Sequence, residues 1–186
     1  MGVVHPGSEL VPSKAELLQA WAPRQAWWPG GDAVPDFQAN FRFDDPRGEV
    51  GIETFLLPID GQIVQIPLTY RSAPLDDAEL VGELEHSALG HRWVYDATTD
   101  PVYVAEATRV IREGATEVTM LRPDGTPIPP RPFTASVRGS GAGAGRLEVA
   151  RVVTPEAPKD ATGTLTATWA EQPEPVVLAW LAADAD

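Results

Sequence analysis

FQANFRFDDPRGEVGIETFLLPIDGQIVQIPLTY, residues 37–70, is the stretch that decides the fold. Apolar and polar residues alternate in three runs of it, and a period of two is typical of half-buried strands. Those runs are residues 37–43, 49–57 and 62–70. Two turn sequences, DDPRG (44–48) and DG (60–61), join the runs. The stretch therefore predicts an antiparallel meander, in which Pro67 indicates an edge or a bulge in the third strand.

Helix signals flank this meander. The run Ser13-Lys14-Ala15-Glu16 is a capping box, and apolar residues follow it at helical spacing as far as Trp21. Asp100-Pro101 combines an N-cap residue with a proline at the first helical position. Gly114 is a natural C-cap. The sequence therefore predicts a second helix over residues 101–113.

Residues 114–186 have a β-rich pattern interrupted by Pro, Gly and Asp. The strand-like runs are residues 117–121, 131–137, 146–153, 163–171 and 176–181. The glycine-rich run 139–145 predicts the tip of a long hairpin. Residues 91–96 alternate like a short strand, whereas residues 76–88 indicate one or two helical turns. Together these patterns predict a single α+β domain over residues 1–186, an antiparallel sheet with one or two packed helices.

Composition excludes several classes of function. The 186 residues carry 14 Lys and Arg against 27 Asp and Glu, a formal net charge of −13. A field of that sign repels phosphate backbones and anionic lipid, so we expect no nucleic-acid partner and no membrane partner. With no cysteine, disulfides and thiolate metal sites are excluded. No run of 18 apolar residues occurs and the first ten residues lack the pattern of a secretory signal, so we expect a cytoplasmic location.

Four longer strings carry a resemblance to a known family. They are HPGSELVPSKAELLQAWAP (5–23), FRFDDPRGEVGIET (41–54), PLTYRSAPL (67–75) and HSALGHRWVYDATTDPVY (86–103). These strings resemble the N-terminal cap domain of bacterial maltokinases, and more closely the stand-alone proteins that carry only such a cap-like domain. The resemblance is dense over residues 1–113 and loose over 114–186, which looks like the variable β-rich portion. It implies a curved antiparallel sheet with a cystatin-like topology.

In the kinases, the resemblance implies that the cap sits on the nucleotide-binding lobe and that the lobes after it transfer phosphate from ATP to a sugar. This chain departs from that pattern. It has no glycine-rich phosphate loop after a strand, no catalytic Asp-with-Asn loop and no Mg²⁺-binding Asp-Phe triplet. The glycine-rich run lacks the Lys and the helix of a phosphate cradle. We therefore expect no enzyme activity, no catalytic residue and no cofactor.

Two sets of polar residues are candidates for chemistry. His86, His91 and Asp96 are candidates for a metal or general-base site, although their spacing fits no helical zinc pattern. Asp44 and Asp45, next to Glu49, can bind a hard cation. The plainer interpretations are a turn held by an Asp–Arg pair and histidines that satisfy a turn and begin a strand. We expect no metal site.

Four further residues are candidates for ligand or partner contacts. Trp27 and Trp28 lie in a predicted loop, where exposed aromatic faces can stack on sugar rings. Arg71 and Arg92 lie close to apolar runs, and each can hold a carboxylate such as Asp96 or Glu53 in a semi-buried network that maintains the fold.

The leading hypothesis is a non-catalytic accessory or interaction domain. The resemblance implies a link to trehalose, maltose or glycogen metabolism through a protein partner, a sugar kinase or another enzyme of those pathways. The alternative hypothesis is a saccharide-binding or other small-molecule-binding module that uses the Trp27 and Trp28 region.

Overall fold

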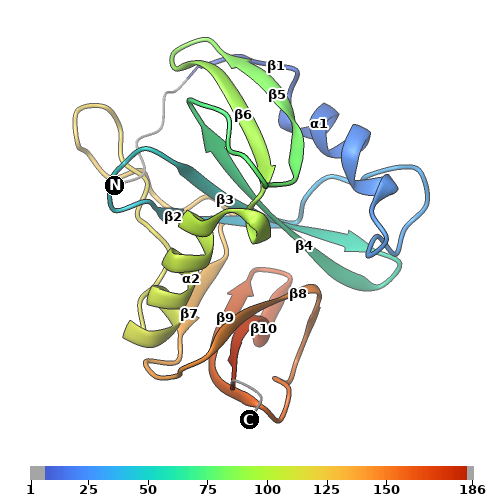
Figure 1. Cartoon of the computed structure of the whole chain (residues 1–186), viewed down its shortest axis with the longest axis vertical. Helices are drawn as coiled ribbons and strands as arrows, with labels where there is room; N and C mark the ends of the chain where they lie inside the picture. Colours follow the sequence, from blue (N-terminus) through green and yellow to red (C-terminus); the bar gives the residue numbers. More distant parts are fainter. Residues whose placement is uncertain (1–6, 184–186) are drawn as a thin grey trace.

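The computed structural model describes residues 7–183 (Figure 1). Strands, two α-helices and two short 3₁₀ turns make up its regular structure. In chain order they are β1 (Leu10–Val11), α1 (Lys14–Trp21), a 3₁₀ turn (Ala22–Arg24), β2 (Ala39–Asp44), β3 (Gly51–Ile59), β4 (Gln62–Arg71), β5 (Leu80–His86), β6 (Gly90–Asp96), a 3₁₀ turn (Ala97–Thr99), α2 (Pro101–Glu113), β7 (Ser136–Gly139), β8 (Arg146–Thr154), β9 (Ala161–Trp169) and β10 (Gln172–Ala182).

The predicted meander is present. β2 pairs antiparallel with β3 and β3 with β4, and Asp60 and Gly61 form the turn between the last two. On its edge away from β3, β4 pairs with β6 along its last residues and with β8 at Val64. From β6 the order runs on to β5 and β1, and from β8 to β10, β9 and β7. The two parts join where Val64 of β4 pairs with Val152 of β8. The result is a curved, mostly antiparallel sheet with two helices, so the predicted α+β class is confirmed.

Both predicted helix starts are also confirmed. The Ser13 side chain accepts from the Glu16 amide, and the Glu16 carboxylate accepts from the Ser13 amide at 2.8 Å. Asp100 accepts from the Val102 amide at 2.9 Å, and Pro101 follows as the first helical residue of α2. α2 ends at Gly114, whose φ of 64° is a left-handed conformation that favours glycine.

Three local predictions were wrong. Residues 76–88 form no helical turns; instead Leu80–His86 is β5, because β6 and β1 pair with its two edges. Residues 117–121 and most of 131–137 are irregular, and β7 begins only at Ser136. The 139–145 run is no hairpin tip, since β7 pairs with β9 and β8 with β10. It is a crossover that needs glycine: a Cβ on Gly145 would stand 1.9 Å from the Ala182 carbonyl oxygen.

Pro67 lies in an interior strand, which corrects the predicted edge or bulge. It faces Thr54 in the continuous register of β3 with β4. On its other side β4 pairs with β8 at Val64 and with β6 from Leu68 onward. Pro67 therefore falls in the gap between these two neighbouring strands. No strand lies there to accept a hydrogen bond from its backbone nitrogen, so the absence of an amide hydrogen in proline costs no sheet hydrogen bond.

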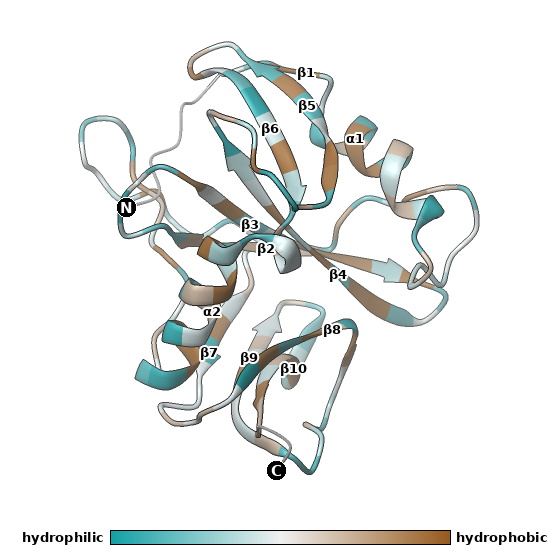
Figure 2. Cartoon of the chain, in the orientation of Figure 1, coloured by the Kyte–Doolittle hydropathy of each residue, from teal (hydrophilic) through white to brown (hydrophobic). Residues whose placement is uncertain are grey.

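The alternation of β3 divides the buried apolar residues between two cores. Ile52 and Leu56 face the core that contains α2, whereas Phe55 and Leu57 face the core that contains α1. α2 contributes Tyr103, Ala107, Val110 and Ile111 to its core, and α1 contributes Leu17, Leu18 and Trp21 to the other. In Figure 2 the hydrophobic residues lie along the strands and on one side of each helix, as this division requires.

Gln65 connects the two parts of the sheet. Its side chain is 1% exposed, and its amide nitrogen donates to the Ala150 carbonyl of β8 at 2.5 Å and to the Leu178 carbonyl of β10. A buried amide of this kind is stabilising only when its donors are satisfied. Gln65 therefore contributes to how the β7–β10 part packs on β4.

Candidate functional site

The structure has a pocket beside the β2–β3 turn, with a volume of about 440 Å³, which we call the turn pocket. Half of the candidate residues predicted from the sequence line it. These are Asp44 and Asp45 from the end of β2 and the following turn, His86 from the end of β5, and Arg92 from β6. The pairing of β5 with β6 brings His86 and Arg92 to one face of the sheet, and Asp44 and Asp45 reach the same pocket from the turn after β2.

A second pocket, of about 500 Å³, lies between β2 and the segment 116–134, and we call it the loop pocket. The segment is held against β2 by backbone hydrogen bonds: the Asn40 amide donates to Phe133, the Ala135 amide to Asn40, and the Val118 amide to Arg42. The two pockets share three lining residues, Lys14, Arg42 and Glu53. These three side chains therefore form the partition between them.

A polar cluster around Glu53 makes up this partition. Glu53 is 5% exposed; it pairs with Lys14 of α1, accepts from the Asn40 amide nitrogen at 2.9 Å, and accepts more distantly from the Tyr70 hydroxyl at 3.4 Å. The Lys14 ammonium also lies 5.3 Å from the centre of the Tyr70 ring. The cluster thus ties the first turn of α1 to β2, β3 and β4.

Burial and charge compete at this cluster. Burial by itself raises the pKa of Glu53, but the positive charges of Lys14 and Arg42 outweigh it and lower the pKa below the usual range of a glutamate. Burial and the neighbouring Glu53 carboxylate raise the pKa of Tyr70 well above that of an exposed tyrosine. At neutral pH Glu53 is therefore ionised and Tyr70 is a neutral hydrogen-bond donor.

The amino-acid sequence did not predict that the residues of this cluster lie together. The sequence pattern identifies Lys14 only as part of a capping box, and Glu53 only as a possible partner of Arg71 or Arg92. The available signal was the polar face of the β2 run, where Asn40 and Arg42 alternate with phenylalanines. That pattern identifies a polar face but not the helix that covers it.

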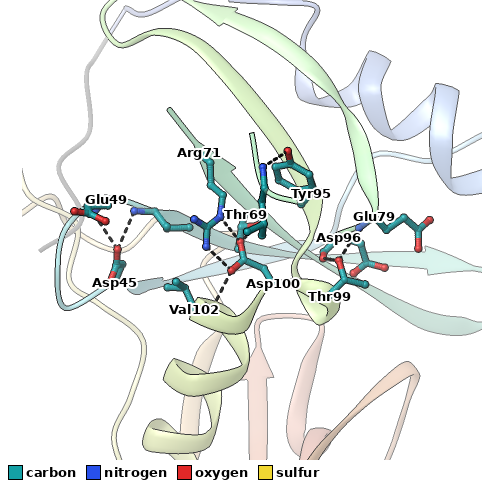
Figure 3. Close-up of polar contacts among 12 residues, drawn as sticks. Asp45, Glu49, Thr69, Arg71, Glu79, Tyr95, Asp96, Thr99, Asp100 and Val102 are labelled. Atoms are coloured by element: carbon teal, nitrogen blue, oxygen red, sulfur yellow. Dashed lines mark hydrogen bonds and ion pairs between the residues drawn. The ribbon is translucent and has the colours of Figure 1, made fainter. Parts of the chain in front are cut away.

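Asp45 has a structural role in the turn pocket. Its carboxylate is buried and accepts from the backbone amides of Arg47, Glu49 and Val50 at 2.9–3.0 Å. Figure 3 shows the contact with Glu49. These bonds hold the turn between β2 and β3, as an Asp at the start of a turn commonly does. The turn is therefore held by backbone donors rather than by the expected Asp–Arg pair.

Arg71 pairs with Asp100, not with the Asp96 or Glu53 suggested by the sequence. Arg71 donates to both Asp100 oxygens at 2.7 Å, and the Thr69 hydroxyl donates to one of them at 2.8 Å (Figure 3). The Asp100 side chain is fully buried. Burial alone raises the pKa of Asp100, but the bonds from Arg71, Thr69 and the Val102 amide outweigh it and lower the pKa below its usual value.

Acid should therefore destabilise this protein through Asp100. Because the folded-state pKa is below the unfolded value near 3.8, the stabilisation is present above that pH and is lost as the pH falls through the folded pKa. We expect the urea concentration at the midpoint of unfolding to be lower at pH 3 than at pH 5, which lie about one unit on either side of an aspartate pKa. In Asp100→Asn this drop should be smaller. An equal drop in both proteins would contradict the assignment.

His91 lies on the opposite face of the sheet from the turn pocket, because successive residues of a strand point to opposite sides. Its ring nitrogens contact Glu85 at 2.6 Å and Glu83 at 2.9 Å, and its ring packs edge-on against Trp93. The Glu85 contact, aided by Glu83, raises the pKa of His91 above its usual value. His91, His86 and Asp96 are therefore not brought together as a single site.

Asp96 is buried and pairs with Arg151 of β8, which also donates to the Thr98 hydroxyl at 2.9 Å. The Arg151 guanidinium lies 4.4 Å from the ring centre of Trp27. Trp28 is 9% exposed, belongs to the core around α1, and donates to the Gly31 carbonyl at 2.9 Å. Neither tryptophan lines the turn pocket or the loop pocket.

Arg92, the remaining candidate, donates to the backbone carbonyl of His91 at 2.7 Å while lining the turn pocket.

Within residues 7–183, no three His, Cys, Asp or Glu side chains are arranged to hold a metal ion. None of the helices described is long and apolar enough to cross a membrane.

Comparison with known proteins gives one match. Searches of curated proteins and of solved structures return none. The family model described as the maltokinase N-terminal cap domain matches residues 21–100, the range from the last residue of α1 to the N-cap of α2. This range contains the β2–β6 sheet, Glu53 and Asp100. The resemblance predicted from the sequence is confirmed over that range, because residues 21–100 match the model of the maltokinase N-terminal cap domain.

Proposed function

We propose that this chain acts as a non-catalytic accessory domain that binds a protein partner, a sugar kinase or another enzyme of maltose, trehalose or glycogen metabolism. The observation that carries the proposal is the match of residues 21–100 to a cap domain, with no catalytic kinase domain detected beside it. In the kinases, the resemblance implies a cap that rests on the nucleotide-binding lobe. A chain with this sheet can present the same surface to a separate partner.

The arrangement of the four buried carboxylates within residues 21–100 supports a non-catalytic role. Asp45 is held by backbone amides, Glu53 by Lys14, Asp96 by Arg151 and Asp100 by Arg71. A general base or a metal-holding carboxylate needs lone pairs directed at a substrate or an ion. These four carboxylates instead accept from donors of the chain itself, so they maintain the fold.

Nucleotide binding is the first test. We expect no heat of binding when ATP with Mg²⁺ is titrated into the chain, and no phosphoryl transfer to maltose or glucosamine, since the sequence has neither a phosphate loop nor Mg²⁺-binding residues. An intact maltokinase serves as the positive control. ATP binding in the micromolar range that is lost on a single substitution would overturn the non-catalytic assignment.

The second test concerns the partner. The immobilised chain is exposed to a purified maltokinase and to the same kinase with its own cap domain removed. We expect the chain to bind the cap-less kinase more tightly, because the cap's place on the nucleotide-binding lobe is open only there. An unfolded variant, Val110→Asp, is the negative control. Binding to neither kinase would refute a maltokinase partner, and equal binding to both would refute docking in place of the cap.

A further inference from the structure

Arg42 places a cation between the two pockets. It extends from the polar face of β2, and its buried Nε has no hydrogen-bond partner among residues 7–183. The adjacent Glu53 does not satisfy it, since its oxygens accept from Lys14, Asn40 and Tyr70. A buried donor without an acceptor costs about 1–3 kcal/mol, so an unsatisfied group of this kind indicates a ligand, an ion or a water.

The loop pocket has an excess of cations over carboxylates, although the chain as a whole carries a net charge of −13. Its cations are Lys14, Arg42 and Arg131, and its carboxylates are Glu53 and Glu117. Both carboxylates have partners: Glu53 pairs with Lys14, and Glu117 accepts from the Val137 amide at 2.7 Å. Arg42 and Arg131 therefore line one pocket without forming a salt bridge among the residues described, although the Arg42 charge also acts on Glu53 from the neighbouring strand.

The wall opposite β2 is largely apolar. It is formed by the segment 116–134, which Figure 1 shows as the yellow-to-orange loop beside β2. Phe133 and Ile128 line the pocket, and Arg131 lies over the Phe133 ring at 5.7 Å. The volume of about 500 Å³ is within the range of about 300–1,000 Å³ that holds small molecules. An apolar wall with a few convergent polar groups is the common composition of such pockets.

We infer that the loop pocket binds a small organic anion, whose carboxylate or phosphate group is held by Arg42 and Arg131 and whose body packs on Phe133. Guanidinium groups present paired donors that match the oxygens of both groups. The turn pocket is a poorer anion site, because Asp44, Asp45 and Glu49 also line it. This inference concerns a different surface property from partner binding and does not depend on the proposed function.

Calorimetric titration of the full chain in 150 mM salt, about the physiological ionic strength, tests the inference with four probes. Inorganic phosphate and glucose 6-phosphate represent the phosphate source, gluconate the carboxylate source, and glucose the neutral body alone. We expect at least one anionic probe to bind and glucose to bind more weakly. Arg42→Gln and Arg131→Gln should each weaken that binding by about tenfold or more, the effect of losing a charged hydrogen bond.

Two controls separate a ligand site from general attraction to the protein. Arg47→Gln removes an exposed arginine that lines neither pocket and should leave the affinity unchanged. Arg131 is exposed, so Arg131→Gln remains informative even if Arg42→Gln proves unstable. The side-chain Nε–H resonance of Arg42 should also shift on titration with the bound anion. Absence of binding by all three anions, or binding that survives both substitutions, would overturn the inference and leave Arg42 with water alone.

Discussion

Replacing Val110 by aspartate is expected to destabilise the fold by more than about 4 kcal/mol, enough to unfold most domains of this size. Val110 is fully buried on α2, in the core that contains Ile52, Leu165 and Leu178. An aspartate there places a carboxylate in an apolar environment without a partner, and it also removes the packing of the valine. Urea unfolding followed by circular dichroism measures the loss.

Ala105→Asp is the matched control for this substitution, because Ala105 is on the same helix and exposed. It introduces the same side chain into solvent, so the cost should stay near the difference in helix propensity, below about 1 kcal/mol. If both variants unfold at the same urea concentration as the parent chain, α2 does not pack on the sheet as the structure describes.

Asp100→Ala should have the second-largest effect, a loss of about 3 kcal/mol in the free energy of unfolding, at the lower end for a broken buried ion pair. The N-cap bond to Val102 alone would account for only about 1 kcal/mol. The substitution also leaves the Arg71 guanidinium, 19% exposed, without the two acceptor oxygens that it has in the native chain. The larger part of the lost stability therefore comes from leaving the Arg71 guanidinium without an acceptor.

Two companion variants separate these contributions. Asp100→Asn keeps an oxygen that can accept from the Val102 amide but loses the charge, so its stability should fall between the parent chain and Asp100→Ala. Asp124→Ala removes an exposed aspartate that accepts from the Thr126 amide at 2.9 Å in a turn, and it should cost less than about 1 kcal/mol. Equal losses for Asp100→Ala and Asp124→Ala would contradict a buried Arg71–Asp100 pair.

The candidate site was only partly predictable. Asp44, Asp45, His86 and Arg92 do line one pocket, as a sequence-based search for polar residues near turns can suggest. Arg71 and His91 were named with them but do not line it: Arg71 pairs with Asp100, and His91 contacts Glu83 and Glu85. Lys14 and Glu53 were not recognised as a pair because 39 residues separate them, and no local pattern indicates a contact at that range.

The amino-acid sequence alone determined the parts of the fold that depend on neighbouring residues. The β2–β4 meander, the capping box at Ser13 and the helix between Asp100 and Gly114 all follow from periodicity and from cap and turn chemistry. The family resemblance over residues 21–100 was also legible in the strings of residues themselves.

Tertiary structure decided everything that depends on distant pairing. Leu80–His86 became a strand because β1 and β6 border it, Pro67 entered an interior strand because its neighbours leave a gap there, and the 139–145 run became a crossover because its flanking strands pair elsewhere. The partners of Arg71 and Glu53, and the two pockets that share Arg42, were decided in the same way. Local propensity spans about 1 kcal/mol per residue, so the burial and pairing of a whole strand readily override it.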